Sequence, residues 1–212
     1  GIYQEFRDAD DTLLTSFKTL IGHFDTAARK LVPWTAKSLE LAHAAKIDLP
    51  DHAAPAYVPA GSRITPMTLA QSQDAGFHRI GGNSVNSWEC DQFGHMNTMF
   101  YIRRQTEAVP HMWHRLGVDL SDMRANGRGF AVGEMRMSYL NELLEGDIVE
   151  TWTAIREVKE KTLLAEHRLY NAETGQLAAI SMVRAVHFDL NARRAIAWSD
   201  EIETGGGWHN QG

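Results

Sequence analysis

The stretch from Trp88 to Asn97 gathers acidic and polar side chains around one glycine. It reads Trp-Glu-Cys-Asp-Gln-Phe-Gly-His-Met-Asn and lies between a predicted strand and the start of a predicted helix. A helix N-terminus offers free N–H groups and a positive dipole end, which can polarise a thioester carbonyl and stabilise the oxyanion that forms. A carboxylate a few residues earlier can attack that carbonyl or activate a water. The pattern therefore indicates Asp91 as a base or nucleophile.

The residues that follow Asp91 have predicted supporting roles. Gly94 lets the backbone turn tightly and leaves room for a ligand. We expect backbone amides near Asn97 and Thr98 to form an oxyanion hole. His95 is either an orienting histidine or a direct participant, and the sequence leaves these two roles open.

Simpler interpretations exist for the acidic residues of this stretch. Asp91 could serve only as a cap of the helix that follows, as loop carboxylates before helices often do. Glu89 lies two residues earlier, so both side chains share a face if the strand continues to Asp91. Glu89 would then raise the pKa of Asp91 or be solvated, and we expect it to be solvated. We interpret Cys90, which has no base partner in the sequence, as a small packed residue.

The composition restricts the class of protein. The chain has 212 residues, of which 43% are hydrophobic and 23% charged, as in an ordinary globular protein. The formal net charge of −6 argues against duplex nucleic acid as a partner, because that partner requires a dense cationic face. The single cysteine excludes an intrachain disulfide framework and favours a cytoplasmic location. We expect no membrane association, because the sequence lacks a run of about 18 apolar residues and a secretory signal pattern.

Two helices are predicted in the first part of the chain. Apolar residues recur at helical spacing over residues 10–31 and would make one packing face: Leu13, Phe17, Leu20, Ile21 and Phe24. A second helix is predicted over Thr35–Lys46. A proline-rich linker follows, and Gly81-Gly82 indicates a break. We find no internal repeat and no low-complexity tract.

After this break we predict one strand, one long helix and a run of strands. The first strand covers Asn83–Cys90, and the helix covers Thr98–Leu116, where Pro110 should kink or interrupt it. Strand-like segments follow closely: Phe130–Leu140, Asp147–Glu157, Thr162–Tyr170, Gln176–Leu190 and, as an extension, Arg194–Trp198. Consecutive strands favour antiparallel pairing. The predicted class is therefore α+β, an antiparallel sheet wrapped around one long helix, with an N-terminal helical extension.

Two ordered motifs in this region resemble those of a known family. Glu89–Asn97, followed by Tyr101, resembles the signature Asp-x-Asp-x-x-Gly-His-x-Asn with its downstream tyrosine, with Glu89 in place of the first aspartate. Met137–Glu142 and the Gly146-Asp147 turn resemble the family's strand-and-turn segment. The family is the hotdog-fold acyl-CoA thioesterases of the 4-hydroxybenzoyl-CoA thioesterase type. Within it, the chain looks like the branch fused to carnitine dehydrogenases, which acts on short quaternary-amine acyl-CoA esters.

The resemblance implies hydrolysis of a small or medium acyl-CoA to the free acid and CoA. It implies a catalytic group made of Asp91, His95, Asn97 and Thr98. It implies that substrate is bound by Gly94, Tyr101 and Glu134. No separate cofactor is expected, because CoA is part of the substrate. A homodimer or higher homo-oligomer is predicted, because in hotdog families the sheet and helix of one copy complete the pocket of the other.

Further side chains have both a functional and a simpler interpretation. Glu134 could reach the pocket across a dimer interface, but we favour a partly exposed strand carboxylate. Four cations could bind CoA phosphates, although isolated surface cations are more common: Arg103, Arg104, Lys159 and Lys161. His95, His111 and His114 lack partners at metal-ligand spacing, so no metal site is predicted.

Two alternative functions stay open. A hotdog enoyl-CoA hydratase or dehydratase has four residues between its Asp and His in an Asp-x-Asn-Pro-x-His context, whereas three separate Asp91 from His95 and no proline is present. A non-catalytic acyl-CoA-binding module would keep the fold. In all three cases we expect a helical extension and linker over residues 1–80, a hotdog domain over 81–202 and a flexible tail over 203–212.

Overall fold

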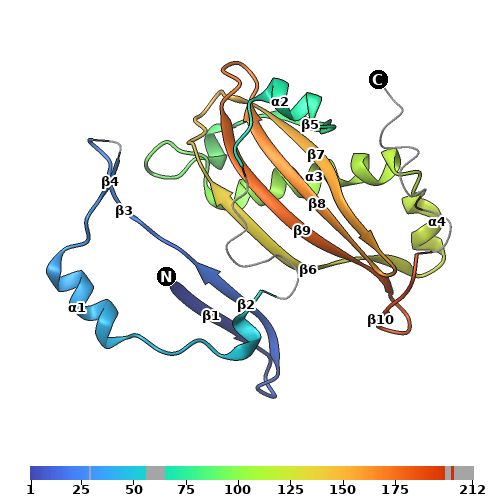
Figure 1. The fold of residues 1–212 in the computed structure, drawn as a ribbon, viewed down its shortest axis with the longest axis horizontal. Helices are drawn as coiled ribbons and strands as arrows, with labels where there is room; N and C mark the ends of the chain where they lie inside the picture. Colours follow the sequence, from blue (N-terminus) through green and yellow to red (C-terminus); the bar gives the residue numbers. More distant parts are fainter. Residues whose placement is uncertain (29, 56–64, 199–201, 203–212) are drawn as a thin grey trace. The chain divides into compact units, whose positions relative to one another are not determined.

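The structure of the chain is a computed structural model. It describes all residues except 29, 56–64, 199–201 and 203–212, and it divides into two compact units, Gly1–Pro55 and Ala56–Gly212. The first unit holds short strands and a helix, and the second holds the large sheet and the long central helix (Figure 1). The predicted domain boundaries stay a prediction, and the predicted tail lies outside the described residues.

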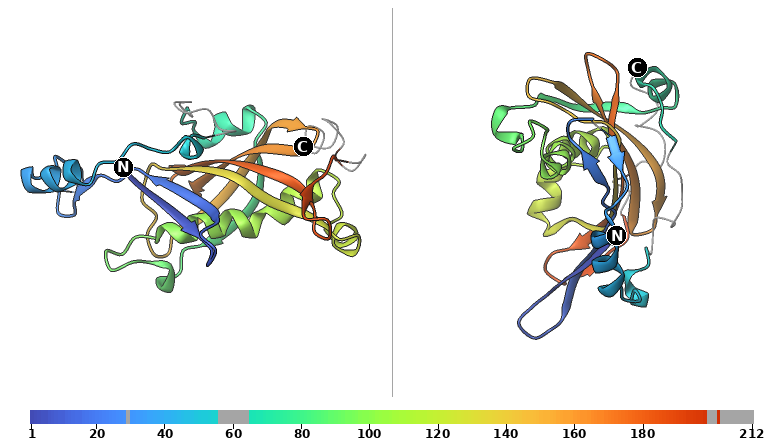
Figure 2. Two further views of the ribbon diagram at one scale, coloured as in Figure 1. Left: turned by 90° about the horizontal axis from the view of Figure 1, so that it is seen from below. Right: turned by 90° about the vertical axis from the view of Figure 1, so that its left-hand side faces the viewer.

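In the second unit, the long helix α3 (Thr98–Arg115) runs along one face of an antiparallel sheet (Figure 2). The strand order is β5–β7–β8–β9–β6, and the short β10 also pairs with β9. The strands are β5 (His78–Ser84), β6 (Arg128–Tyr139), β7 (Ile148–Lys159), β8 (Thr162–Asn171), β9 (Leu177–Asp189) and β10 (Arg194–Ala195). Short helices also occur: α2 (Leu69–Asp74), η2 (Ser87–Glu89) and α4 (Leu120–Ala125). The predicted α+β sheet around one long helix is confirmed, and we refer to this unit as the hotdog unit.

The helix α3 begins and continues for identifiable reasons. The Asn97 side chain caps it by accepting a hydrogen bond from the Met99 N–H at 3.2 Å. Pro110 lies inside the helix, which continues for a further turn, so the predicted interruption is wrong. Met112 and Trp113, which follow the proline, are each only 2% exposed. Their burial in the core stabilises the helical turn that lacks the proline N–H.

The Gly81-Gly82 pair lies inside β5, so the predicted break is wrong. A Cβ atom at Gly81 would lie 2.9 Å from the Cβ of Ala108 on α3, which is closer than carbon atoms normally approach. Glycine is therefore required where this strand and the central helix approach each other. The strand predicted over Asn83–Cys90 starts earlier than expected and ends at Ser84, and η2 and a loop follow it.

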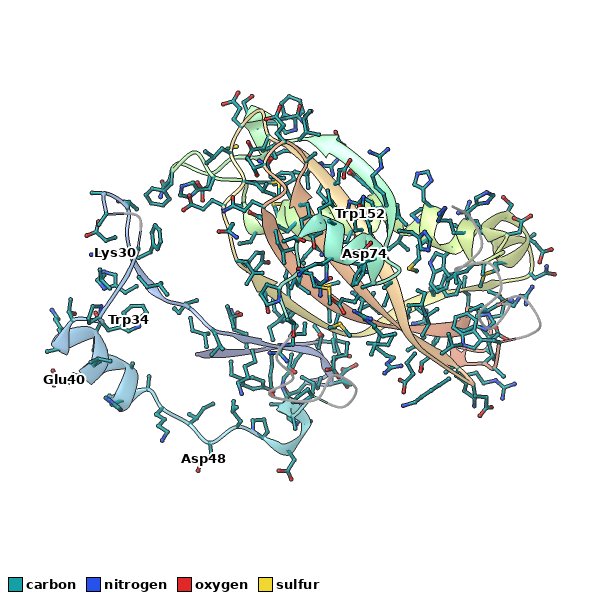
Figure 3. The ribbon with its side chains drawn as sticks, turned by 45° about the horizontal axis from the view of Figure 1, so that its top comes forward. Lys30, Trp34, Glu40, Asp48, Asp74 and Trp152 are labelled. Carbon is teal, nitrogen blue, oxygen red and sulfur yellow. The ribbon has the colours of Figure 1, made fainter. Side chains whose placement is uncertain are left out.

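The segment Thr65–Phe77, which includes α2, covers the other face of the sheet. The Tyr170 hydroxyl on β8 donates to the Met67 carbonyl at 3.0 Å and lies 2.7 Å from the Ser72 hydroxyl. Phe77 is 3% exposed and belongs to the same core cluster as Trp152 of β7, which Figure 3 labels. This cover segment therefore shares a core with the strands of the hotdog unit.

In the first unit, the structure replaces the helix predicted over residues 10–31 with strands. β1 (Ile2–Arg7) pairs with β2 (Leu13–Thr19), and β3 (His23–Asp25) pairs with β4 (Lys30–Val32). The Asp8 carboxylate accepts hydrogen bonds from the Asp10 and Thr12 amides, which stabilises a turn where the helix was expected to begin. Asp11 in that turn has φ of 63°, a conformation that an α-helix excludes. The predicted N-terminal helical extension is therefore wrong.

The second predicted helix of this unit is confirmed. It is α1 (Ala36–Ala44), and the Thr35 hydroxyl caps it by accepting a hydrogen bond from the Ser38 N–H at 3.1 Å. A short helix, η1 (Asp51–Ala53), follows. Within the described part of the chain, every helix is too short or too polar to cross a membrane. A cytoplasmic location stays a prediction.

A row of buried polar side chains crosses the interface between the sheet and α3. Thr153, His167 and Ser181 are neighbours on β7, β8 and β9, and the Thr153 hydroxyl lies 2.6 Å from His167 Nδ1. The Ser181 hydroxyl donates to Gln105 Oε1 on α3 at 2.8 Å. These side chains are 0–2% exposed. Because burial disfavours a charged imidazole, the pKa of His167 is lowered from 6.5 to about 4.

We expect His167 to make the stability of the protein depend on pH. The unfolded chain binds a proton near pH 6.5, whereas the folded protein binds it near pH 4. The stability associated with a neutral His167 is therefore complete above about pH 6.5 and is lost as the pH falls to about 4. The loss should reach about 3 kcal/mol, measured as the free energy of unfolding in urea at several pH values.

His167→Gln is the matched control, because it removes the titrating group and keeps a polar side chain beside Thr153. The free energy of unfolding of this variant should change less between about pH 6.5 and 4 than that of the wild type. A wild-type value that stays constant over this range would contradict the prediction.

Candidate active site

Residues Glu89–Asn97 form a closed turn immediately before α3. Cys90 and Met96 form an antiparallel bridge, and the Asp91 N–H donates to the His95 carbonyl at 2.8 Å. The Asn97 N–H donates to the Glu89 carbonyl, also at 2.8 Å. We refer to the tip of this turn, Asp91–His95, as the Asp91 loop.

The second sequence motif lies directly beside the Asp91 loop. His95 forms an antiparallel bridge with Leu144, and the Met96 N–H donates to the Leu143 carbonyl at 2.7 Å. On the other side of η2, the Val85 N–H donates to the Asp147 carbonyl at 2.8 Å. The two motifs, which are separated by about forty residues in the sequence, are thus adjacent through backbone hydrogen bonds.

The Asp91 side chain is oriented by the backbone of its own loop. Its Oδ1 accepts hydrogen bonds from the Phe93 N–H at 2.8 Å and the His95 N–H at 3.3 Å. Among the described residues, none donates a hydrogen bond to its other oxygen, Oδ2. The capping interpretation is wrong, because Asn97 and not Asp91 caps α3. Asp91 is half-buried, so its carboxylate is held in position while remaining accessible.

The start of α3 follows the loop closely. Asn97 and Thr98 are exposed, and the Asn97 side chain and carbonyl accept from the Met99 and Phe100 amides. Thr98 is the first helical residue, and among the described residues none accepts a hydrogen bond from its N–H. The positive end of the α3 dipole and this amide therefore lie next to the Asp91 loop in the chain.

Glu89 is buried and paired, so the prediction that it is solvated is wrong. It is 2% exposed, and its Oε2 accepts from Arg104 Nη2 on α3 at 2.5 Å and from the Asn86 N–H at 2.8 Å. Burial opposes ionisation of Glu89, but the bonds from Asn86 and Arg104 outweigh it and hold the pKa of Glu89 below its usual range. Arg104 is itself 5% exposed, so it is not the surface cation that the sequence suggested.

His95 lies beside a carboxylate that the sequence did not single out. Its Nε2 is buried, has no hydrogen-bond partner in the described part of the chain, and lies 3.6 Å from Glu142 Oε1. Glu142 belongs to the second motif, so its place in that motif was the signal that could have identified it. The two motifs together place Glu142 beside His95, which belongs to the Asp91 loop.

The three predicted substrate-binding residues lie in different environments. Tyr101 is 4% exposed and packs edge-on against Tyr139 at 5.1 Å; burial raises its pKa to about 12. Gly94, with φ of 78°, has open space where a Cβ would lie. Glu134 is half-buried on β6, five residues before Tyr139, which is roughly 16 Å along a strand. Glu134 therefore lies farther along β6 than the end at which Tyr139 packs against Tyr101.

Other side chains of the region have structural surroundings. The Cys90 thiol is half-buried and lies 3.7 Å from the Asn86 carbonyl; burial, and then neighbouring carboxylates, raise its pKa. Arg103 is paired with Glu107 at 2.7 Å on the exposed face of α3. In the described residues there is no group of three or more His, Cys, Asp or Glu side chains that could hold a metal ion.

A family model matches residues 85–204, which is more than half of the chain, and its family is the thioesterase-like superfamily. The chain belongs to this superfamily. The match includes the Asp91 loop, α3 and every strand from β6 to β10. Among curated proteins, none matches the sequence.

Solved structures of other proteins are similar to 55–60% of this chain. A Staphylococcus aureus protein solved in complex with CoA is 22% identical, with a TM-score of 0.56 over 60% of this chain and 81% of its own. A DHNA-CoA thioesterase from Staphylococcus aureus is 17% identical, with a TM-score of 0.52 over 55% and 78%. A gentisyl-coenzyme A thioesterase is 23% identical, with a TM-score of 0.52 over 57% and 96%. These likenesses establish the hotdog fold.

We expect Arg104→Ala to destabilise the protein by about 3–5 kcal/mol, because it leaves the Glu89 carboxylate buried without its cation. Arg103→Ala is the matched control: its pair with Glu107 is exposed, so the loss should be below about 1 kcal/mol. Urea denaturation of both variants measures the difference.

The double variant Glu89→Gln/Arg104→Met removes both charges. It should lose less free energy of unfolding than Arg104→Ala, because no unpaired charge is buried. Equal losses in Arg103→Ala and Arg104→Ala would contradict the assignment of Glu89–Arg104 as the pair that joins α3 to the turn.

Proposed function

We propose that this protein is an acyl-CoA thioesterase that hydrolyses a small or medium acyl-CoA to the free acid and CoA. The observation that carries the proposal is the orientation of the Asp91 carboxylate by loop amides, immediately before the N-terminus of α3. Thioester hydrolysis needs a positioned carboxylate and an oxyanion site, and this arrangement offers both. Membership of the thioesterase-like superfamily supports the proposal, as does the similarity to a protein solved with CoA.

In the proposed reaction, Asp91 takes a proton from a water while the water oxygen attacks the thioester carbonyl. Alternatively, the Asp91 carboxylate attacks the carbonyl itself, and a water then hydrolyses the resulting anhydride. In both cases the carbonyl oxygen becomes an oxyanion, to which the Thr98 N–H donates. The carbon–sulfur bond breaks, CoA leaves as a thiolate and takes up a proton, and the acyl group is released as the acid.

His95 and Glu142 are the proposed polar pair beside Asp91. A carboxylate near one ring nitrogen of a histidine favours one tautomer and one ring orientation. The separation of 3.6 Å between His95 Nε2 and Glu142 Oε1 supports this role for Glu142. His95 would then orient the substrate carbonyl or supply the proton to the CoA thiolate.

The proposed substrate class follows from the family branch and from the surface near the loop. Trp88 is 72% exposed and Phe93 is 57% exposed, on either side of Asp91 in the sequence. Aromatic faces attract quaternary ammonium groups, so these residues support a short quaternary-amine acyl group. Gly94 leaves open space for a ligand. Tyr101 and Glu134 stay proposed substrate-binding residues. Tyr101 lies in the core cluster that contains Leu143, and Glu134 would be contributed across a dimer interface.

A panel of acyl-CoA esters with a thiol reagent tests the function and its alternatives. The panel spans short, branched, aromatic and betaine-like acyl groups. Release of free CoA supports the thioesterase. Addition of water to an enoyl-CoA without release of CoA would instead support the hydratase, and binding without turnover would support a non-catalytic module.

We propose that the active form is a homodimer or higher homo-oligomer, with the Asp91 loop near the interface. β6 pairs with β9 along one edge, and among the described strands none pairs with its other edge. Val132 on β6 is 60% exposed. An unpaired strand edge presents free N–H and C=O groups that can pair with another chain. Light scattering at micromolar concentration should give at least twice the mass of the chain, and a monomer would contradict a shared site.

Asp91→Asn should reduce turnover of the best acyl-CoA by about 10²–10⁴ while leaving the melting temperature unchanged. Asparagine keeps the size of the side chain and can still accept hydrogen bonds from the Phe93 and His95 amides. It lacks the negative charge that proton abstraction or attack requires. Steady-state kinetics and thermal denaturation of both proteins measure the two effects.

His95→Ala is the companion variant. A loss of turnover without a loss of stability would make His95 a participant in the reaction.

For Asp91, hydrolysis by Asp91→Asn within a few-fold of the wild-type rate would refute the mechanism, provided that the wild type hydrolyses some thioester. A single turnover in ¹⁸O-labelled water then tests the nucleophilic route: label in the Asp91 carboxylate requires an anhydride that water opens at the aspartyl carbonyl, whereas a general base leaves Asp91 unlabelled.

A further inference from the structure

The first unit exposes its apolar side chains. Among its described residues none is buried, and its exposed large apolar side chains range from 38% to 81% exposure. Several lie on β1 and β2 or follow them directly: Ile2, Phe6, Leu14, Phe17, Leu20 and Ile21. A segment that buries so little apolar surface cannot offset the entropy lost when its backbone is ordered. The unit therefore requires a complementary surface.

The sequence of the first unit repeats the end of the hotdog unit. Residues 23–34 read His-Phe-Asp-Thr-Ala-Ala-Arg-Lys-Leu-Val-Pro-Trp, and residues 187–198 read His-Phe-Asp-Leu-Asn-Ala-Arg-Arg-Ala-Ile-Ala-Trp. Six of these twelve positions are identical, at a constant difference of 164 in residue number. The expectation that the chain has no internal repeat is therefore wrong. The similarity is confined to a short stretch, and sequence patterns alone assigned the first copy to a helix.

The two copies make the same side-chain contacts. His23 Nδ1 lies 3.0 Å from the Pro33 carbonyl, and His187 Nδ1 lies 3.1 Å from the Ala197 carbonyl, ten residues on in both cases. Each imidazole stacks on the tryptophan that ends its copy, with ring centroids 5.4 Å and 4.6 Å apart. In each copy the aspartate two residues after the histidine accepts from two following backbone amides at 2.8–2.9 Å. The copies therefore share a local structure as well as a sequence.

The equivalence extends back through the preceding hairpin. The register of β1 with β2 shifts after Phe6, and the register of β8 with β9 shifts after Leu169. These two residues are equivalent by pairing, because Phe6 pairs with Thr15 and Leu169 pairs with Ala179, and Thr15 and Ala179 differ by 164 in residue number. Asp8 and Asn171 occupy the same place after this shift, and each side chain accepts hydrogen bonds from two amides of its turn. The hairpin β1–β2 thus corresponds to β8 and the first part of β9. The hairpin β3–β4 corresponds to the last part of β9 and to β10.

A shared backbone conformation supports this equivalence. Asp11 has φ of 63° and Gly175 has φ of 68°, and each lies two residues before its second strand. A positive φ is uncommon outside glycine. Its occurrence at Asp11, in the position of Gly175, indicates that both turns end in the same backbone conformation, although the turn after β1 is one residue shorter than the turn after β8.

The equivalence identifies which face of the first hairpin is uncovered. It matches Phe6 with Leu169 and Phe17 with Ser181. In the hotdog unit, Leu169 packs in a core cluster with a tyrosine of α3, and Ser181 donates to a glutamine of α3. The apolar face of β1–β2 therefore corresponds to the face of the large sheet that the central helix covers.

We propose that Ile2–Trp34 is the closing strand segment of a second hotdog module, and that the apolar face of β1–β2 binds the remainder of such a module. That remainder is a central helix with strands equivalent to β6 and β7. In the hotdog unit these strands pair with the outer edges of β9 and β8. In the described part of the first unit, β1 and β2 pair only with each other. The inference does not depend on thioester hydrolysis.

The hotdog unit of a second copy of this chain fits this role poorly. Its own β8 and β9 already cover the inner face of α3, where Leu163, Leu169 and Ser181 are 0% exposed. A central helix that lacks its own closing strands is the complementary surface. The partner is therefore a hotdog-type polypeptide that supplies a helix and its flanking strands.

Two extended chains test the proposal. In the first extended chain, a second copy of residues 65–164 is placed directly before Ile2. Ile2 is the equivalent of Ala165, so the added Leu164 continues into the strand as it does in the hotdog unit. In the control chain, residues 65–198 precede Thr35, so that the authentic closing strands replace Ile2–Trp34. Hydrogen exchange of the β1 and β2 amides in the first chain should be at least about 10-fold slower than in the parent chain, because they are then paired and covered.

Phe17→Asp separates covering of the apolar face from other effects. In the extended chain it should restore fast exchange, whereas in the parent chain, where Phe17 is 49% exposed, exchange should not change. The proposal is overturned if β1 and β2 exchange as fast in the extended chain as in the parent. It is also overturned if the extended chain does not fold while the control chain does.

Discussion

The buried ion pair between Glu89 and Arg104 is the interaction on which the candidate active site depends. It joins the turn before α3 to the helix itself, and Arg104 also donates to the Ser84 carbonyl at the end of β5. A charge buried in this way is tolerated only while its partner is present. The pair therefore holds the strand, the Asp91 loop and the central helix in one arrangement, which a catalytic carboxylate requires.

Backbone hydrogen bonds complete that arrangement. The segment around Leu143 pairs with the Asp91 loop on one side, and the Tyr101 side chain packs beneath it. The proposed reactive groups thus lie on loops, while a buried helix and sheet determine where the loops are. His95 and Glu142 come from two different motifs, so their proximity is a product of this packing and not of either motif alone.

The first unit shows what happens when the same strand pattern lacks its helix. Its hairpins keep the turn contacts of β8, β9 and β10, because these contacts are local and involve residues close in sequence. Its apolar face stays exposed, because covering that face requires elements distant from it. Local hydrogen bonds can therefore specify a strand segment, but only a helix and neighbouring strands bury it.

The sequence by itself determined the order of strands and helix after β5, the helix α1, and the two motifs that contain Asp91 and Glu142. Periodicity and turn residues report such features because they depend on neighbouring residues. Only the tertiary structure decided that Glu89 is buried, that Asn97 and not Asp91 caps α3, and that residues 10–31 form strands. Each of these features depends on contacts between distant segments or on the conformation of one turn. The spacing of residue types along the chain predicts neither of them.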